Sequence, residues 1–469
     1  MLRSRVLLAV LLGVGFLLLF AQANRPSLDT DGVHYAAVAK EMARSGRFLA
    51  PFDPIVNGTY YFHFGFSLWP TALVFQLLGV CPATAKLYSM GMTLAALGGL
   101  FLLGRMLVSP WAGWCAGVSF LATNHVLRIA RQCRVDLPLI GFLVWAYVGL
   151  LMAQKGSRAW YLLAGVASLG AIMTKEVVGL IPFATLAAYL VLRRQWRELL
   201  HPALWVGVAI AVGPVLGWIF LERELYQTSV WDAYLGQTLL YHLQSYPVGA
   251  PWYYYGEVIV TKNGYLLPLA LTGAWMAWNR IRRREEPRWL LIFLWALALP
   301  IGFSLGRNKA HYYILPMYGA VALLIGLACD RLIRQPWRER VVKTTAALAV
   351  LGAVGLACFP IPARRVRYAA NIRMAPQIDA VLERAPGEVI VVRQDVASLL
   401  FYADQVRRVT SAHHDGFADL LSKPPEGRRY CLIGKKDWGL VDPEARLRWA
   451  LVLDDGERIF VRQDAAAQI

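Results

Sequence analysis

Charged residues are scarce in this sequence of 469 residues: Asp, Glu, Lys and Arg together make up 17% of it, whereas hydrophobic residues make up 57%. A typical soluble domain has about a quarter of its residues charged. The composition therefore excludes an ordinary soluble protein. Repeated apolar runs of about 20 residues indicate membrane-spanning helices instead.

Acidic residues are fewer than basic ones, with 30 Asp and Glu against 48 Lys and Arg, which gives a net charge of +18. The basic residues occur in short clusters between the hydrophobic runs, and this pattern is typical of cytoplasmic loops in membrane proteins. A nucleic-acid-binding protein would gather them on one polar domain. We therefore exclude nucleic acid as a partner.

Cysteine is also rare, and the six cysteines show no CxxC or other metal-ligand spacing. They are interpreted as small core residues, which excludes a zinc site or a disulfide framework. His413-His414-Asp415 has the residue types of a metal site, but adjacent side chains on a strand point in opposite directions, so we predict a polar loop. No metal site is predicted from spacing, and no internal repeat points to a transporter with inverted halves.

The first apolar run, residues 6–23, follows Arg3 and Arg5 and lacks a convincing signal-peptide cleavage site. It is predicted to be the first membrane helix, with a cytoplasmic N-terminus.

The next run, 64–80, is short for a span and is interrupted by Pro70 and Gln76. If it crossed the membrane, every later arginine cluster would lie outside, whereas basic loops prefer the cytoplasmic side. We therefore predict an interfacial or re-entrant segment.

The sequence predicts an α-helical polytopic membrane protein with about eleven spans. Because the N-terminus is predicted to be cytoplasmic, an odd number of spans places the C-terminus on the extracytoplasmic side. We expect a transmembrane domain over 1–361, with a long first external loop at 24–85. The spans after the first are predicted at 86–107, 110–127, 136–153, 159–174, 177–192, 203–221, 256–279, 289–305, 311–329 and 344–361.

Residues 362–469 are more polar and form the second predicted domain. Short apolar segments alternate there with a helix-like segment, which is typical of a small α/β domain. The segments are 387–393, 396–402, 405–410, 429–434 and 450–462. We predict this domain on the extracytoplasmic side.

The stretch 29–46 concentrates reactive side chains, with carboxylates and an imidazole among small apolar residues. Asp31 precedes a predicted helix at 33–44, which Ser45-Gly46 ends. An aspartate in this position is commonly an N-cap, and it can equally be a catalytic carboxylate.

The predicted topology collects ionisable and aromatic residues on the external face, close to the membrane. Carboxylates suit general-base work, lysine and arginine suit a phosphate group, and tyrosine suits a sugar or the interfacial aromatic belt. An N-cap role for Asp136 and snorkelling of the cations remain as alternatives. The candidate site residues are Asp31 and Asp136 for catalysis, and His34, Tyr35, His63, Lys175, Arg307, Lys309 and Tyr313 for substrate binding.

Four stretches resemble motifs of a known group of enzymes. They are Asp31-Gly-Val-His-Tyr-Ala-Ala-Val-Ala-Lys-Glu-Met, Asn57-Gly-Thr-Tyr-Tyr-Phe-His-Phe-Gly-Phe-Ser-Leu-Trp, Arg128-Ile-Ala-Arg-Gln-Cys-Arg-Val-Asp136-Leu-Pro-Leu and Phe303-Ser-Leu-Gly-Arg-Asn-Lys309-Ala-His-Tyr-Tyr-Ile-Leu-Pro316, with Met173-Thr-Lys-Glu as a weaker fifth. On these stretches the chain resembles the GT-C class of membrane glycosyltransferases, in the superfamily of bacterial protein O-mannosyltransferases and aminoarabinose transferases.

The resemblance implies a GT-C-like fold in the bacterial inner membrane and a polyprenyl-phosphate-linked sugar as donor. It implies Asp31 as general base in an inverting transfer to a lipid, glycan or protein acceptor, with assistance from Asp136. Lys175, Arg307 and Lys309 would bind the phosphate, and a divalent metal ion is left open.

Two positions depart from the family pattern: Gly32 stands where relatives often have Glu, and Phe64 where they often have Lys. Two other functions are weighed, a transporter or flippase of lipid-linked sugars and a non-catalytic membrane scaffold. A transporter would need ionisable residues near mid-membrane, whereas the predicted spans are nearly uncharged at their centres.

Overall fold

The computed structural model describes residues 3–21, 23–26, 28–60, 63–226, 250–306, 309–359, 368–392, 396–406, 409–412 and 427–464. The chain forms two compact units, each described by itself. The helical unit contains Met1–Ala23, Tyr61–Ser67 and Lys86–Phe359, and the mixed unit contains Asn24–Tyr60, Leu68–Ala85 and Pro360–Ile469. Most of the predicted first external loop thus falls in the same compact unit as the C-terminal segment. The domain division at residue 361 stays a prediction.

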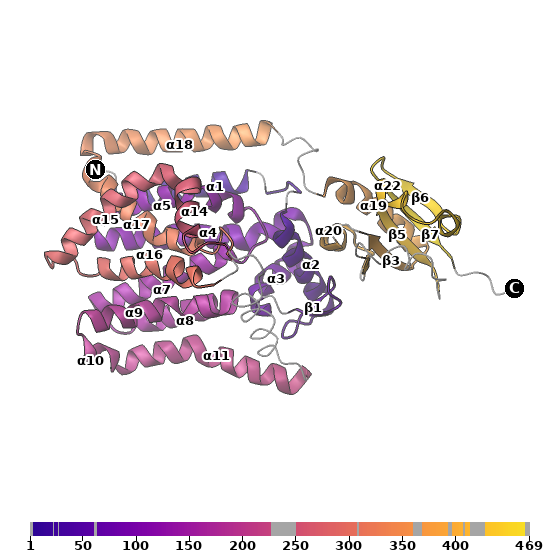
Figure 1. Ribbon diagram of the computed structural model, residues 1–469. Coiled ribbons are helices and arrows are strands. Elements are labelled where there is room, and N and C mark those ends of the chain that lie inside the picture. The colour runs from indigo at the N-terminus through magenta and orange to yellow at the C-terminus, as the bar shows by residue number, and fades with distance from the viewer. Residues whose placement is uncertain are drawn as a thin grey trace. The chain divides into compact units, whose positions relative to one another are not determined.

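The helical unit is a bundle whose long helices run roughly parallel or antiparallel to one another (Figure 1). α7 packs on α8, α8 on α11, and α5 and α15 on α17. Its core contains large buried aromatic side chains, among them Tyr147 and Trp295, whose rings stack 4.1 Å apart. The helices are α1 (Ser4–Phe20), α4 (Pro82–Leu107), α5 (Pro110–Ala122), α6 (Asn124–Ala130), α7 (Asp136–Lys155), α8 (Trp160–Lys175), α9 (Ile181–Leu192), α10 (Trp196–Leu199), α11 (Pro202–Tyr226), α14 (Tyr254–Asn263), α15 (Leu267–Arg282), α16 (Trp289–Ser304), α17 (Tyr318–Leu332) and α18 (Gln335–Cys358).

Within the described ranges, six helical stretches are long and apolar enough to cross a membrane: Pro82–Leu107, Asp136–Lys155, Trp160–Leu192, Pro202–Leu225, Leu315–Leu332 and Gln335–Cys358. Shorter apolar helices occur at Ser4–Phe20, Trp69–Leu78 and Trp289–Ser304. The mostly helical fold is therefore confirmed, while the count of eleven spans and the sidedness of the termini stay predictions.

Two predicted spans are interrupted. The span 110–127 breaks at Thr123, whose backbone is extended, into α5 and α6. The span 256–279 breaks into α14 and α15, joined by the 3-10 turn Gly264–Leu266, and Pro268 lies in the first turn of α15. Proline has no backbone N–H to continue a preceding helix, so a new helix begins there.

The mixed unit contains a five-stranded sheet with the order β4-β3-β5-β7-β6. β4, β3 and β5 are parallel, while β7 is antiparallel to both β5 and β6. The predicted small α/β fold is therefore confirmed. The elements are α2 (Thr30–Ser45), β1 (Phe52–Asp53), β2 (Gly58–Thr59), α3 (Trp69–Leu78), α19 (Ala369–Arg384), β3 (Glu388–Val392), α20 (Val396–Tyr402), β4 (Val409–Ala412), β5 (Arg429–Gly434), α22 (Lys435–Trp438), α23 (Pro443–Arg446), β6 (Ala450–Asp454) and β7 (Arg458–Gln463).

The predicted single apolar segment 450–462 is instead the hairpin formed by β6 and β7. Asp455 accepts hydrogen bonds from the backbone N–H groups of Glu457 and Arg458, at 3.0 and 2.8 Å. Gly456 has a φ of +92°, which a residue with a side chain rarely adopts. These two residues turn the chain, and neither is visible in the hydrophobic pattern alone.

The short apolar run 64–80 contains α3, with Pro70 in its first turn. Ten residues of α-helix are about 15 Å long, half of the hydrocarbon thickness of a membrane. α3 packs against α2, and the Gln76 amide donates a hydrogen bond to the carbonyl of Ala43. The polar residue that interrupts the run therefore joins two helices of the mixed unit.

Lys40 of α2 is buried and connects the first-loop segment to α20. Its ammonium group donates hydrogen bonds to the carbonyls of Leu400, Phe401 and Ala403, at 3.0, 2.8 and 2.9 Å, and lies 2.9 Å from Asp404 Oδ1. Burial lowers the pKa of Lys40, and the hydrogen bond to Asp404 opposes this shift. These acceptors replace the water that the ammonium loses, at a helix C-terminus that favours positive charge.

We expect Lys40→Met to destabilise the packing of α2 against α20 by about 3 kcal/mol, because three buried carbonyls lose their donor. Hydrogen exchange of the amides in α2 and α20 measures this loss. Lys435→Met is the matched control, since Lys435 pairs with Asp454 at a partly exposed site and should change stability by less than about 1 kcal/mol. Equal protection in both variants would contradict the anchoring role of Lys40.

Candidate functional site

The N-terminus of α2 places two aspartates in different roles. α2 begins at Thr30, so the predicted start at residue 33 is wrong by three residues. Asp29 is the N-cap, with its carboxylate accepting the N–H of Gly32 at 2.7 Å. Asp31 is half-buried in the first turn, where the helix dipole favours a carboxylate. The capping role therefore belongs to Asp29, and Asp31 is not the residue that caps this helix.

His34 lies one turn further along α2 and is held by an aspartate. Its Nε2 is 2.8 Å from Oδ2 of Asp53, which is fully buried and accepts the N–H of Ile55 through its other oxygen at 2.9 Å. Tyr60 lies edge-to-face against the His34 ring, and the ring of Tyr35 is 6.2 Å from it. Asp53 thus fixes the orientation of the predicted substrate-binding histidine, a role that the sequence pattern did not reveal.

In the helical unit, Asp136 forms the centre of a buried ionic cluster. It begins α7, and its side chain is 3% exposed. Oδ2 accepts a hydrogen bond from Nε of Arg134 at 2.9 Å, and Oδ1 accepts one from Nζ of Lys175 at 3.1 Å. Lys175 is the last residue of α8, so the cluster forms where one helix begins and another ends. The structure brings together two residues predicted separately, Asp136 and Lys175.

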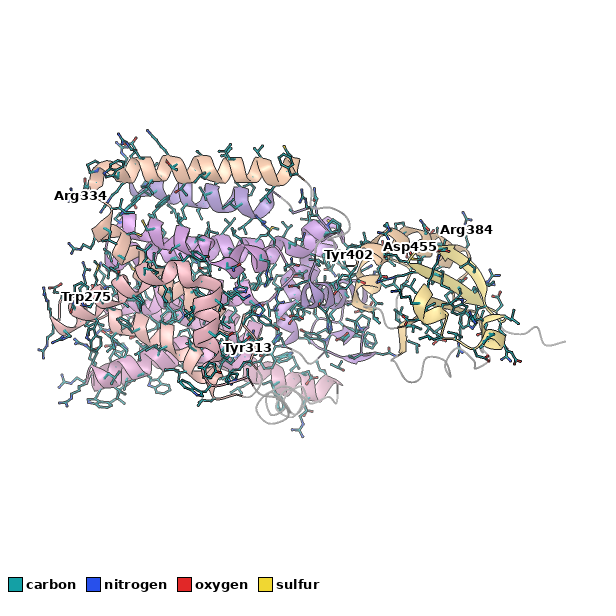
Figure 2. The ribbon with its side chains drawn as sticks, turned by 45° about the horizontal axis from the view of Figure 1, so that its top comes forward. Trp275, Tyr313, Arg334, Arg384, Tyr402 and Asp455 are labelled. Atoms are coloured by element: carbon teal, nitrogen blue, oxygen red, sulfur yellow. The ribbon has the colours of Figure 1, made fainter. Side chains whose placement is uncertain are left out.

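Two tyrosines complete this cluster. The guanidinium carbon of Arg134 lies 4.5 Å from the ring centre of Tyr312, and Nζ of Lys175 lies 5.2 Å from that of Tyr313. Tyr313, labelled in Figure 2, was a predicted site residue, while Arg134 and Tyr312 were not among the predicted ones. Aromatic faces attract cations most strongly where water is excluded. The tyrosines therefore help to hold the two cations in place.

Glu176, the residue after Lys175, contacts a second group of residues. Its Oε1 accepts the N–H of Phe64 at 2.9 Å and lies 3.5 Å from Nδ1 of His63. Glu176 has a φ of +26°, outside the helical range, and it begins the 3-10 turn Glu176–Leu180. A side chain on Gly179 would lie 2.2 Å from the backbone nitrogen of Ile172, so glycine permits this turn to pack on α8.

Phe64, where the resemblance led us to expect Lys, is buried and contacts Trp218 edge-to-face at 5.0 Å. An aromatic contact thus occupies the position expected to supply a charge.

The remaining predicted residues do not join these clusters among the described residues. Lys309 donates a hydrogen bond to the carbonyl of Ala250 at 2.9 Å. Arg307 and the segment 413–415 lie outside the described residues. Asp31 and His34 belong to the mixed unit, whereas Asp136, Lys175 and His63 belong to the helical unit.

The described residues do not fit a metal site. Among them, no group of three or more His, Cys, Asp or Glu residues is placed to hold an ion. Both oxygens of Asp136 already accept hydrogen bonds from cations, so a divalent ion there would meet two positive charges. With one carboxylate and two cations, the cluster carries one net positive charge, which suits an anionic ligand better.

A family model described as dolichyl-phosphate-mannose-protein mannosyltransferase matches residues 66–220. An undecaprenyl phosphate-α-4-amino-4-deoxy-L-arabinose arabinosyl transferase of Pseudomonas paraeruginosa is 24% identical over 528 aligned residues, which cover 98% of this chain and 91% of that one. The corresponding transferase of Aeromonas salmonicida is 26% identical over 72% of this chain, but that match spans only 62% of the relative's own length.

Solved structures show the same fold. The crystal structure of ArnT from Cupriavidus metallidurans bound to undecaprenyl phosphate has a TM-score of 0.76 at 20% identity and covers 99% of each chain. The Archaeoglobus fulgidus oligosaccharyltransferase in its apo form has a TM-score of 0.57 at 12% identity and covers 99% of this chain and 75% of its own. The chain is thus similar, in sequence and in fold, to the protein O-mannosyltransferases and aminoarabinose transferases, which are membrane glycosyltransferases of the GT-C class.

Proposed function

We propose that this protein transfers a sugar from a polyprenyl-phosphate donor to an acceptor hydroxyl, with inversion at the anomeric carbon. Two kinds of relatives support the donor class: transferases named for an undecaprenyl-phosphate-linked aminoarabinose, and a structure of the same fold solved with undecaprenyl phosphate. We place this enzyme in the bacterial inner membrane. Its acceptor would be a lipid, glycan or protein.

The observation that carries this proposal is the buried cluster of Asp136, Arg134 and Lys175. The donor is a phosphodiester with one negative charge. When the bond from the anomeric carbon to the phosphate oxygen breaks, the released polyprenyl phosphate gains negative charge. A lysine point charge and an arginine fork, prepositioned in a site of low dielectric, stabilise this charge as it develops.

Asp31 supplies the base in this mechanism. The acceptor oxygen attacks the anomeric carbon, and its proton passes to the carboxylate of Asp31. Because Asp29 already caps α2, the carboxylate of Asp31 is not needed for that purpose. His34, Tyr35 and His63 are assigned to the substrates. The clusters of basic residues between helices favour a reaction on the extracytoplasmic face.

Asp31→Asn should lower the rate of transfer by about 100-fold or more, since a general base contributes about that factor. The measurement is mass spectrometry of cell-envelope glycolipids and glycoproteins in a deletion strain that carries the variant.

Asp29→Asn is the matched control. Asparagine caps a helix as well as aspartate does, so this variant should retain both its fold and its activity. Unchanged transfer by Asp31→Asn, at normal protein levels, would remove Asp31 from the mechanism.

Lys175→Met should weaken binding of undecaprenyl phosphate by about tenfold to 100-fold, the worth of one charge-assisted hydrogen bond. The affinity is measured on the purified full chain. Lys175→Arg retains the charge and should recover most of the affinity. An unchanged affinity in Lys175→Met would show that the phosphate binds elsewhere, whatever the role of Asp31.

A further inference from the structure

A groove lies in the helical unit, where α4 and α7 end and α8 begins. These three helices are labelled in Figure 1. This groove has a volume of about 550 Å³. Its walls are largely apolar, and two basic residues are among those that line it. The residues that matter here are Leu102, Met106, Trp145, Trp160, Arg105 and Lys155.

The two cations of the groove have no carboxylate partner among the described residues. Arg105 lies in the last turn of α4, and Lys155 is the last residue of α7. Both are exposed. The nearby Arg158, by contrast, pairs with Glu198 at 3.0 Å. Two uncompensated positive charges therefore border an apolar surface, which is the pattern of a site for an anionic amphiphile.

Local packing explains why the groove opens at this end of the helices. A side chain on Gly99 would lie 2.5 Å from Val144, so α4 and α7 are in close contact there, and Trp145 donates a hydrogen bond to the carbonyl of Ala95 at 3.0 Å. Leu102 and Met106 follow Gly99 on the same face of α4, at spacings of three and seven residues. Part of the apolar wall of the groove is thus built by α4 beyond its tight contact with α7.

The groove is separate from the ionic cluster around Asp136. Asp136 begins α7 and Lys155 ends it, and 20 residues of helix span about 30 Å. The groove therefore lies at the opposite end of a helix long enough to cross a membrane. This end also carries the clusters of Arg and Lys that indicate the cytoplasmic side. Anionic lipids give that leaflet its negative surface potential.

We propose that this groove binds an anionic glycerophospholipid. Its phosphate would lie between Arg105 and Lys155, and an acyl chain would pack on Leu102, Met106 and Trp145. Trp160, 39% exposed, suits the headgroup level of the membrane. A zwitterionic lipid carries its own cation and gains less from the two basic residues. This inference does not depend on the proposed transferase activity.

The test measures binding of phosphatidylglycerol to the purified full chain in mixed micelles, with phosphatidylcholine and inorganic phosphate as comparison probes. The double variant Arg105→Gln/Lys155→Gln should bind phosphatidylglycerol about 30-fold more weakly, the worth of two surface charges. The double variant Arg282→Gln/Arg334→Gln removes the same charge outside the groove and should bind normally (Arg334 is labelled in Figure 2).

Normal binding by the groove variant, or equal losses in both double variants, would overturn the proposal. Equal binding of inorganic phosphate would also overturn it, because the site would then recognise a free anion and not a lipid. If the groove variant fails to fold, a phosphatidylglycerol with a photoreactive acyl chain is cross-linked to the unmodified chain. Label on the ends of α4, α7 and α8 supports the site, and label confined to other helices contradicts it.

Discussion

The exclusion of water from a membrane interior is the constraint on which the helical unit depends. Backbone N–H and C=O groups find no partner in lipid, so each span must satisfy them within its own helix. Ionisable side chains are costly there and gather where helices begin and end. Asp136 begins α7, Lys175 ends α8, and Arg105 lies in the last turn of α4. These three ionisable residues of the described chain therefore lie close to helix ends.

At the helix ends that carry Asp136 and Lys175, the buried charges pair with one another and form an organised site. Removing Asp136 from water would be unfavourable without Arg134 and Lys175, whose hydrogen bonds replace the lost hydration. The rings of Tyr312 and Tyr313 lie against the two cations. Such a prepositioned cluster needs little reorganisation when charge develops on a phosphate. At the other end, the exposed Arg105 and Lys155 border an apolar groove and are suited to recognise a lipid headgroup.

Much of the fold could be predicted because hydrophobic length is a strong signal. The predicted span 289–305 corresponds to α16 at Trp289–Ser304, and the predicted helix 396–402 matches α20 at Val396–Tyr402. The errors occur where a few residues override the pattern. Pro268 starts a new helix inside an apolar run, and Asp455 with Gly456 turns one apolar segment into two strands. Hydropathy does not record these effects, because they depend on backbone geometry and on single hydrogen bonds.

The sequence by itself determined the class of protein, since runs of about 20 apolar residues and clusters of basic residues leave few alternatives. It also supplied Asp136, Lys175 and Tyr313 as separate candidates from motifs. Only the tertiary structure decided which residues act together. Arg134 and Tyr312 join Asp136, Asp53 orients His34, and Lys40 reaches carbonyls about 360 residues away in the chain. Apart from Arg134, which lies two residues before Asp136, these partners are distant in sequence. The physical reason is that packing, not local pattern, selects the partner of a buried charge.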